Sequence, residues 1–381
     1  MEKQKKQVRK QGVDLPFLVI MLVMLAFGLL MVFSASSPSA FYNEGDKFYY
    51  IKKQLLFTGL GFVAMFFAMR VGYKTVKRLS PLLFAISFGL LVLVLLIGTV
   101  GGGAQRWLSL GPVSFQPSEL VKFTIVFYFS KRIADSPRNQ IQKIREGLLP
   151  YLLIIGAILG VMLLQDHLSG AIIIFLASMI MLLAGGAKIK HFVVAGASCL
   201  GVLVPAAFLV SYRLKRILIF LDPFSDKTGD GWQIVQGLYA IASGGLFGLG
   251  LGQSRQKFLY IPEAHNDYIY AIICEELGFF GALIVAALFA LLITRGIYIA
   301  LHAPDTFSSL TVFGIISIIG LQYLINVAVV TSTIPNTGMQ LPFFSAGGSS
   351  LIFIMAAMGV VLDISRYVKP QGARAREGAV K

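Results

Sequence analysis

The sequence predicts an all-α, polytopic membrane protein with ten transmembrane helices. Of its 381 residues, 56% are hydrophobic and 13% are charged, and the mean hydropathy is +0.78. A soluble domain carries about a quarter charged residues, so this composition excludes a soluble enzyme. It also excludes a disordered chain, which requires low hydrophobicity. Ten separate apolar stretches supply the predicted helices.

Most of the apolar stretches approach the length of a membrane span, which needs about 20 apolar residues. The first follows a basic segment, as in a signal peptide, but it is too long for one, so we expect an uncleaved span. The fourth and fifth are short, and almost nothing separates the fifth from the sixth. The stretches are 15–35, 54–71, 81–99, 117–131, 148–165, 168–186, 191–210, 267–294, 308–333 and 349–365.

Lysine and arginine set the predicted orientation, because cytoplasmic segments carry the excess of positive charge. If the N-terminus is cytoplasmic, the whole formal charge of +15 falls on the cytoplasmic side. An even number of spans then places the C-terminus on that side too. Topology therefore explains the basic excess, and no nucleic-acid partner is expected.

The predicted organisation has three parts. A basic cytoplasmic tail (1–13) precedes the membrane domain (14–368), and a disordered basic cytoplasmic tail (369–381) follows it. One loop, 211–266, is long and extracytoplasmic, and it joins the seventh and eighth spans. A loop of this length in a compact bundle is usually functional. It holds a helix-like segment at 232–241 and five glycines within 243–252.

Ionisable residues within the spans are candidates for a functional site, because a charge in hydrocarbon is costly. Glu119 and Lys122 are three residues apart and share a helix face. They form either a local ion pair or the charged wall of an outward-facing cavity. The pattern favours Glu275 as a buried carboxylate satisfied by a neighbouring helix, and Glu276 as structural. The remaining candidates are Asp166 and Asp267.

Asp267 opens the eighth span directly after a polar loop. An aspartate there either caps the helix and faces its positive dipole, or acts as a general base beside substrate-binding loop groups. His265 is close in sequence, but with 4 histidines and no ligand spacing a zinc site has little support. Cys199 and Cys274 lie in apolar runs and are expected to be core residues.

The cations of the long loop also have two interpretations. Exposed cations at this interface commonly meet lipid headgroups. Together with the five glycines they would instead hold a pyrophosphate, since glycine lets backbone N–H groups approach phosphate oxygens. No Walker A or Rossmann glycine motif is present, so bound nucleotide is not expected. These cations are Arg213, Lys215, Arg216, Arg255 and Lys257.

Four segments on the predicted outer side carry longer motifs. They are RWLSLG (106–111) with QPSE (116–119) and Lys122; DP (222–223), GWQ (231–233) and SGG (243–245); SRQK (254–257), IPEAHNDYIY (261–270) and EELG (275–278); and TG (337–338), LPF (341–343) and GGSS (347–350). Together they resemble the SEDS family (shape, elongation, division and sporulation), the FtsW/RodA/SpoVE proteins, over nearly the whole chain. RQK followed by PEAH is more similar to the FtsW/SpoVE branch.

The resemblance implies an enzyme with ten membrane helices that polymerises lipid II into glycan strands at the outer face of the cytoplasmic membrane. It implies a class B penicillin-binding protein, and other division or sporulation membrane proteins, as partners. Asp267 falls on the family's catalytic position, and Arg106, Glu119, Lys122 and Asp166 fall on its cavity. The other expected substrate-binding residues are Arg213, Arg216, Arg255, Lys257, Glu263, His265, Ser349 and Ser350.

Two departures from the family pattern bear on the shape of the cavity. QDHL at 165–168 replaces the frequent PDLG, and Ala346 stands where an aromatic residue is usual.

In the resulting hypothesis, Asp267 accepts the proton of the attacking hydroxyl and cations stabilise the pyrophosphate leaving group. By analogy with glycoside hydrolases, inversion needs only one carboxylate acting on the nucleophile. The sequence requires no cofactor. A divalent cation that bridges the pyrophosphate and Asp267, Glu263 or Asp166 stays open, although no ligand spacing demands one.

Two alternatives stay open: a flippase of lipid-linked precursors, which needs a polar path through the midplane, and a scaffold that recruits a transpeptidase. The sequence also leaves open whether the chain serves division, sporulation or elongation.

Overall fold

A computed structural model describes residues 12–101, 104–110, 113–137, 140–190, 193, 196, 201, 218–226, 229 and 231–368. The predicted seventh span, 191–210, and the loop cations Arg213, Lys215 and Arg216 therefore lie outside the described residues, apart from three isolated positions of that span. The same holds for Cys199 and for nearly all of both predicted tails.

The chain begins with three long apolar helices, α1 (Leu15–Glu44), α2 (Tyr49–Val71) and α3 (Tyr73–Ile97). Asp14 caps α1 by accepting a hydrogen bond from the amide of Phe17. The helix continues well past the predicted end at 35, although its sequence there is polar. Hydroxyl groups of Ser37 and Ser39 bond back to carbonyls within the helix, so these residues are compatible with it.

A small antiparallel sheet follows α3 and departs from the all-α prediction. Its strands are β1 (Thr99–Gly101), β2 (Ala104–Leu110) and β3 (Val113–Phe115), in the order β1-β2-β3. The strands β1 and β3 have three residues each, and β2 (AQRWLSL) alternates irregularly between apolar and polar residues, so the sequence suggested only a loop. The sheet holds Arg106 beside the start of α4.

The central helices are α4 (Pro117–Asp135), α5 (Leu149–Leu164) and α6 (Leu168–Ala184). A 3-10 turn (Gln140–Gln142) and a π-helical turn (Ile144–Leu148) lead into α5. These helices confirm the predicted helical stretches in this part of the chain. Among the described residues, seven helices are long and apolar enough to cross a membrane, and neither α4 nor the shorter α6 is among them.

The C-terminal half contains α9 (Trp232–Gly244), α10 (Ile269–Leu301), α11 (Thr306–Val330) and α12 (Gly348–Ser365). A 3-10 turn, Pro223–Asp226, precedes α9. The helix α9 confirms the helix-like segment predicted inside the long loop. In α11, Asp305 and Ser308 form a capping box.

A kink divides α10 at Gly278, whose φ of 67° and ψ of −162° are not helical. The glycine-rich segment 244–252 supplies the hydrogen bonds that the kink removes. The amide of Phe279 donates to the carbonyl of Gly245 at 2.9 Å, and the amide of Leu249 donates to the carbonyl of Glu275 at 2.9 Å. A Cβ at 278 would lie 2.4 Å from the backbone nitrogen of Gly248, so this close approach requires glycine.

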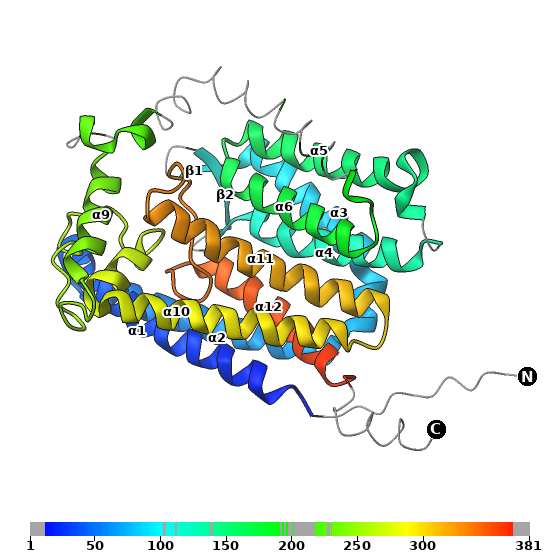
Figure 1. Cartoon of the computed structure of the whole chain (residues 1–381), viewed down its shortest axis with the longest axis horizontal. Helices are drawn as coiled ribbons and strands as arrows, with labels where there is room; N and C mark the ends of the chain where they lie inside the picture. The colour runs from blue at the N-terminus through cyan, green and yellow to red at the C-terminus, as the bar shows by residue number, and fades with distance from the viewer. Residues whose placement is uncertain are drawn as a thin grey trace, which may run out of the picture.

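The labelled helices other than α9 run roughly along the long axis of the molecule (Figure 1). The helix α12 packs along α2, α3 packs against α4, and α11 contacts α4, α6 and α10. The strands β1 and β2 and the helix α9 lie at one end of the bundle, here called the α9 end (Figure 1). The helix α1 begins and α12 ends at the opposite end (Figure 1).

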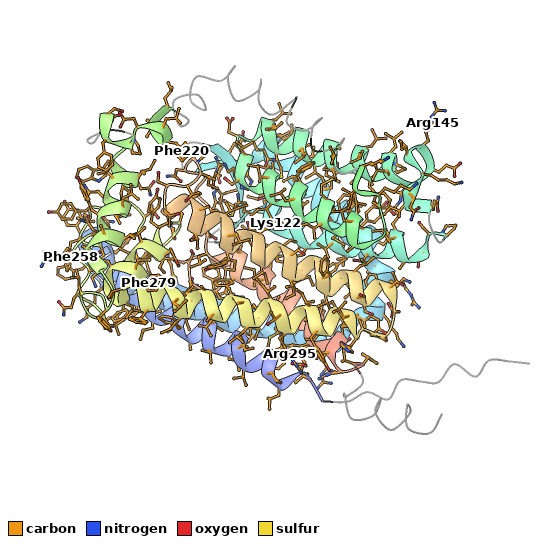
Figure 2. The ribbon with its side chains drawn as sticks, in the orientation of Figure 1. Lys122, Arg145, Phe220, Phe258, Phe279 and Arg295 are labelled. Carbon is orange, nitrogen blue, oxygen red and sulfur yellow. The ribbon has the colours of Figure 1, made fainter. Side chains whose placement is uncertain are left out.

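One ion pair and one hydrogen bond connect α1, α10 and α12 at that opposite end. The guanidinium of Arg295 in α10 donates to both carboxylate oxygens of Asp14, with the shortest distance 2.7 Å. The amide of Asp14 donates to the hydroxyl of Ser365 in α12 at 3.0 Å. Figure 2 places Arg145 and Arg295 at this end and Phe258 and Phe279 at the α9 end. These contacts connect α10 and the start of α1 with the last turn of α12.

Candidate functional site

Glu119 and Lys122 form a buried ion pair in the first turns of α4. Lys122 Nζ lies 2.7 Å from Glu119 Oε1, and the Lys122 side chain is 2% exposed. Figure 2 shows Lys122 in the interior of the bundle. The prediction that these two residues share a face is confirmed. A charge buried this deeply is stable only while it is paired, so each residue depends on the other.

The same carboxylate also connects α4 to α12. The hydroxyl of Ser350 donates to Glu119 Oε2 at 2.7 Å. Ser349 lies beside it in the first turn of α12 and is also buried. The GGSS segment therefore places a hydroxyl donor on the carboxylate, and the predicted residues Glu119, Lys122 and Ser350 form one cluster.

Arg106 reaches from β2 to the turn between α5 and α6. Its Nη2 donates to the backbone carbonyl of Asp166 at 2.7 Å. Asp166 has a φ of 51°, which is uncommon for a residue with a side chain and marks a tightly defined turn. The structure thus brings these two predicted residues together.

His167 belongs to the same region, although it was not among the predicted site residues. It is buried, and its ring nitrogens lie 3.4 and 3.5 Å from Nε2 of Gln116. Burial, followed by the positive charges of Arg106 and Lys122, lowers the pKa of His167 from 6.5 to about 3. The imidazole is therefore neutral at physiological pH. His167 stands where the family pattern PDLG has leucine, and this departure was the sequence signal that could have pointed to it.

Asp267 lies in the turn before α10 and is partly exposed. Tyr268 occupies the N-cap position of α10, and its own side chain makes no capping hydrogen bond. The backbone carbonyl of Asp267 accepts a hydrogen bond from Nδ2 of Asn326 in α11 at 2.8 Å, and the same amide donates to the carbonyl of Met339 at 2.6 Å. Asn326 thus fixes Asp267 relative to the segment before α12.

That segment passes directly beside the carboxylate. Gly338 has a φ of 65°, and a Cβ at this position would lie 3.6 Å from Asp267 Oδ2. The hydroxyl of Ser169, in the first turn of α6, donates to the carbonyl of Thr337. Consecutive contacts therefore connect Arg106, the Asp166 turn, α6 and residues 337–338 with Asp267. These contacts link the predicted residues Arg106, Asp166 and Asp267, which are far apart in the sequence.

The two loop cations that the structure describes, Arg255 and Lys257, differ in burial. Arg255 is exposed, whereas Lys257 is buried. Lys257 Nζ lies 2.8 Å from Glu276 Oε1 and also donates to the hydroxyl of Ser34 in α1 at 3.2 Å. The prediction that Glu276 is structural fits this pair. If Lys257 binds substrate, that contact competes with its ion pair to Glu276.

Glu275 is satisfied by the loop rather than by a neighbouring helix. Its Oε1 accepts from the amide of Arg255 at 2.9 Å, and the hydroxyl of Ser254 donates to its Oε2 at 2.5 Å. Together, the adjacent carboxylates of Glu275 and Glu276 hold residues 254–257 on α10.

Glu263 and His265 face a different set of neighbours. The His265 ring lies 4.3 Å from the ring of Tyr50 in α2, and burial lowers its pKa to about 4. The backbone carbonyl of His265 accepts from the amide of Ala346 at 2.9 Å. Glu263 is exposed and accepts a hydrogen bond from Nδ2 of Asn266. No group of three or more His, Cys, Asp or Glu residues suited to a metal ion occurs within the described residues.

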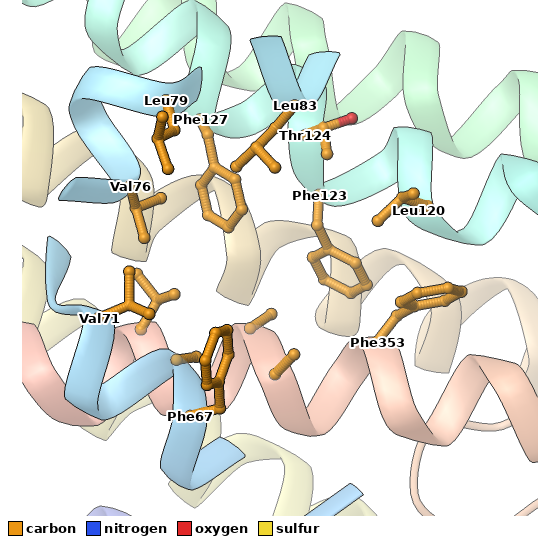
Figure 3. A pocket seen from close by; sticks show the side chains of 14 residues that line it. Phe67, Val71, Val76, Leu79, Leu83, Leu120, Phe123, Thr124, Phe127 and Phe353 are labelled. Carbon is orange, nitrogen blue, oxygen red and sulfur yellow. The ribbon is translucent and has the colours of Figure 1, made fainter. Parts of the chain in front are cut away.

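An apolar cavity of about 260 Å³ lies between α2, α3, α4 and α12. Figure 3 shows Phe67, Phe123, Phe127 and Phe353 around it. Leu120 also lines it and directly follows Glu119, so the cavity begins within one helical turn of the buried ion pair.

The chain is similar to proteins of bacterial cell-wall synthesis along nearly its whole length. It is 45% identical to stage V sporulation protein E of Bacillus subtilis, over 94% of this chain and 98% of that protein. It is 38% identical to a probable peptidoglycan glycosyltransferase FtsW of Geobacter sp. (strain M18), over 95% and 99% of the two chains.

Solved structures give the same result. A chain from a study of a peptidoglycan synthase complex that coordinates polymerization and crosslinking superposes with a TM-score of 0.77, at 29% identity over 93% of this chain and 98% of that one. The rod shape determining protein RodA of Thermus thermophilus superposes with a TM-score of 0.70, at 26% identity over 94% and 98%. The family described as cell cycle proteins matches residues 14–370, and the chain therefore belongs to the FtsW/RodA/SpoVE family.

Proposed function

We propose that the chain is a peptidoglycan glycosyltransferase that polymerises lipid II into glycan strands at the outer face of the cytoplasmic membrane. The full-length similarity to relatives named for this activity carries the proposal. The chain of contacts that links Arg106 and the Asp166 turn to Asp267 supports it. In this proposal the α9 end faces outward.

Asp267 is the proposed general base. A carboxylate on a firmly held turn suits this role, because proton transfer requires a fixed geometry relative to the acceptor hydroxyl. Asn326 holds the backbone of Asp267, and Gly338 leaves space beside its carboxylate. The proton leaves the attacking hydroxyl for Asp267 as the new glycosidic bond forms and the bond to the lipid pyrophosphate breaks.

The leaving pyrophosphate needs positive charge more than it needs a proton. Arg106 and Lys122 are the proposed contributors within the bundle, and Arg255 is an exposed contributor from the loop. Arg213 and Arg216, which lie outside the described residues, stay predicted contributors. The apolar cavity beside Leu120 and Phe353 is the proposed site for part of the polyprenyl tail, since hydrocarbon is favoured in an apolar environment.

A class B penicillin-binding protein is the proposed partner. The similarity to a chain of a peptidoglycan synthase complex that couples polymerization to crosslinking supports this proposal. Polymerisation and crosslinking act on the same strand, so an enzyme for each would benefit from a shared complex.

The test is a polymerisation assay with purified components. The chain, with and without a class B transpeptidase, is incubated with labelled lipid II in detergent and without nucleotide. The proposal predicts a ladder of glycan strands. If no ladder forms, while proteoliposomes containing the chain expose labelled lipid II across the bilayer, the protein is a flippase and the proposal is wrong.

A further inference from the structure

A second cavity, of about 250 Å³, lies at the α9 end between the C-terminal part of α1, the start of α2 and the loop 257–265. Its size is below the usual range of drug-sized pockets, about 300–1,000 Å³, and it suits one small ring. In contrast to the apolar cavity of Figure 3, it combines apolar walls with polar side chains. The polar side chains include Ser39, Asn43, Tyr50, Glu263 and His265.

These groups offer both donors and acceptors of hydrogen bonds. The hydroxyl of Ser39 donates to the carbonyl of Ser36 and keeps its oxygen lone pairs for a further bond. Asn43 is exposed at the end of α1, which leaves its amide accessible. Nδ1 of His265 is buried and has no hydrogen-bond partner among the described residues. Burial also keeps His265 neutral, since its pKa is lowered to about 4.

The charges around the cavity favour an uncharged ligand. Of the described residues that line it, Lys257 carries the only positive charge. Its ammonium group is occupied by Glu276, the hydroxyl of Ser34 and the carbonyl of Gly252, which use its three donors. The exposed carboxylate of Glu263 would repel an anion.

The loop that forms one wall is held in a strained conformation. Leu259 has a φ of 67° and Glu263 a φ of 50°, and both line the cavity. Left-handed conformations of residues with side chains persist where the surroundings enforce them, and they cluster at ligand-binding sites. The same loop continues within two residues from His265 to Asp267, so the cavity adjoins the proposed catalytic turn.

We propose that this cavity binds one sugar ring of the glycan, close to the ring that reacts at Asp267. A pyranose is uncharged, carries several hydroxyl groups and presents an apolar C–H face to an aromatic ring such as that of Tyr50. The inference rests on the proposed function, because it takes its ligand from the growing strand. It gives the enzyme a second hold on the polymer, which keeps the strand bound between additions.

Binding is tested with a soluble oligosaccharide of N-acetylglucosamine and the purified full chain, by saturation-transfer NMR. Tyr50→Leu and Asn43→Ala each remove a contact, and we expect about fivefold weaker binding, the equivalent of one hydrogen bond. Tyr49→Leu is the matched control, because Tyr49 does not line the cavity and its hydroxyl instead accepts from Lys53. Asn43 is exposed, so its truncation leaves the folded core unchanged.

Two further measurements complete the test: oligosaccharide binding by Asp267→Asn, and the length of the glycan strands that Tyr50→Leu makes. The proposal requires that Asp267→Asn still binds the oligosaccharide and that Tyr50→Leu yields shorter strands at matched lipid II consumption. Wild-type binding in both Tyr50→Leu and Asn43→Ala, or loss of binding in Asp267→Asn alone, overturns it. If the wild type makes no strands but binds the oligosaccharide, and Tyr50→Leu loses that binding, the sugar site stands and the proposed polymerase activity is wrong.

Discussion

Lys257 Nζ lies 2.8 Å from Glu276 Oε1 in the interior of the α9 end, where the two side chains are 5% and 0% exposed. This pair, together with Glu275, fastens the loop 254–257 to α10, the helix that begins two residues after Asp267. The loop and the proposed catalytic turn are therefore parts of one rigid unit.

Removal of Lys257 should be strongly destabilising. In Lys257→Met the carboxylate of Glu276 stays buried without its partner, which costs about 3–5 kcal/mol of unfolding free energy. The melting temperature in detergent should fall well below that of Arg255→Met, the exposed control. The double variant Lys257→Met with Glu276→Gln should recover part of the loss. Equal melting temperatures for Lys257→Met and Arg255→Met would contradict this account.

The Glu119–Lys122 pair permits a separation of stability from activity. Lys122→Met alone should destabilise the protein, for the same reason as Lys257→Met. Adding Glu119→Gln removes the unpaired charge and should restore much of the melting temperature, whereas glycan synthesis should stay low because the cation is absent. A stable and fully active double variant would show that the pair only connects α4 and α12.

Gly338 should be required for activity more than for stability. An alanine at its φ of 65° costs about 1–2 kcal/mol and places a methyl group 3.6 Å from Asp267 Oδ2. Gly186→Ala is the matched control, since Gly186 also has a positive φ, of 99°, and lies after α6. Both variants should melt at similar temperatures, but only Gly338→Ala should polymerise slowly. Similar polymerisation rates for Gly338→Ala and Gly186→Ala would show that residues 337–338 do not belong to the active site.

His265 should make the protein sensitive to acid. Its pKa is about 4 in the folded protein, compared with the ordinary value of 6.5 that applies to the unfolded chain. Between pH 6.5 and pH 4 the unfolded chain therefore binds a proton that the folded protein does not. Stability should therefore fall as the pH is lowered through this window. Melting temperatures of wild type and His265→Gln, measured from pH 7 to pH 4, should converge at low pH. A parallel pair of curves would refute the assignment.

The sequence predicted the helices better than their ends. The polar segment after residue 35 hid the continuation of α1 to Glu44, because serine hydroxyls that bond back to the helix leave no trace in hydropathy. The sheet was missed because β1 and β3 have three residues each and β2 alternates only irregularly between apolar and polar residues. Pairings between distant residues, such as that of Ser350 with Glu119, depend on how α12 meets α4 and cannot be predicted from local spacing.

The candidate site was predictable where a charge had to be buried. Glu119 and Lys122 were singled out because a charge in an apolar segment is costly and needs a reason. Asp267, which is partly exposed, was singled out because it opens a span directly after a polar loop. The internal role of Lys257 was missed, because a lysine in a polar loop gives no sign that Glu276 lies beside it. Glu263 and His265 were predicted as substrate ligands, and the structure places them on the cavity beside α1 and α2.

The central claim is that Asp267 is the base of a glycan polymerase, and a single comparison tests it most directly. Asp267→Asn, Asp46→Asn and wild type are assayed side by side for polymerisation of labelled lipid II. Asp46 is the control because it lies in the turn between α1 and α2 and forms an exposed ion pair with Lys52 of α2. We predict that Asp267→Asn loses a factor of about 10²–10⁴ in rate at an unchanged melting temperature, and that Asp46→Asn polymerises as wild type. Full polymerisation by Asp267→Asn would contradict the account.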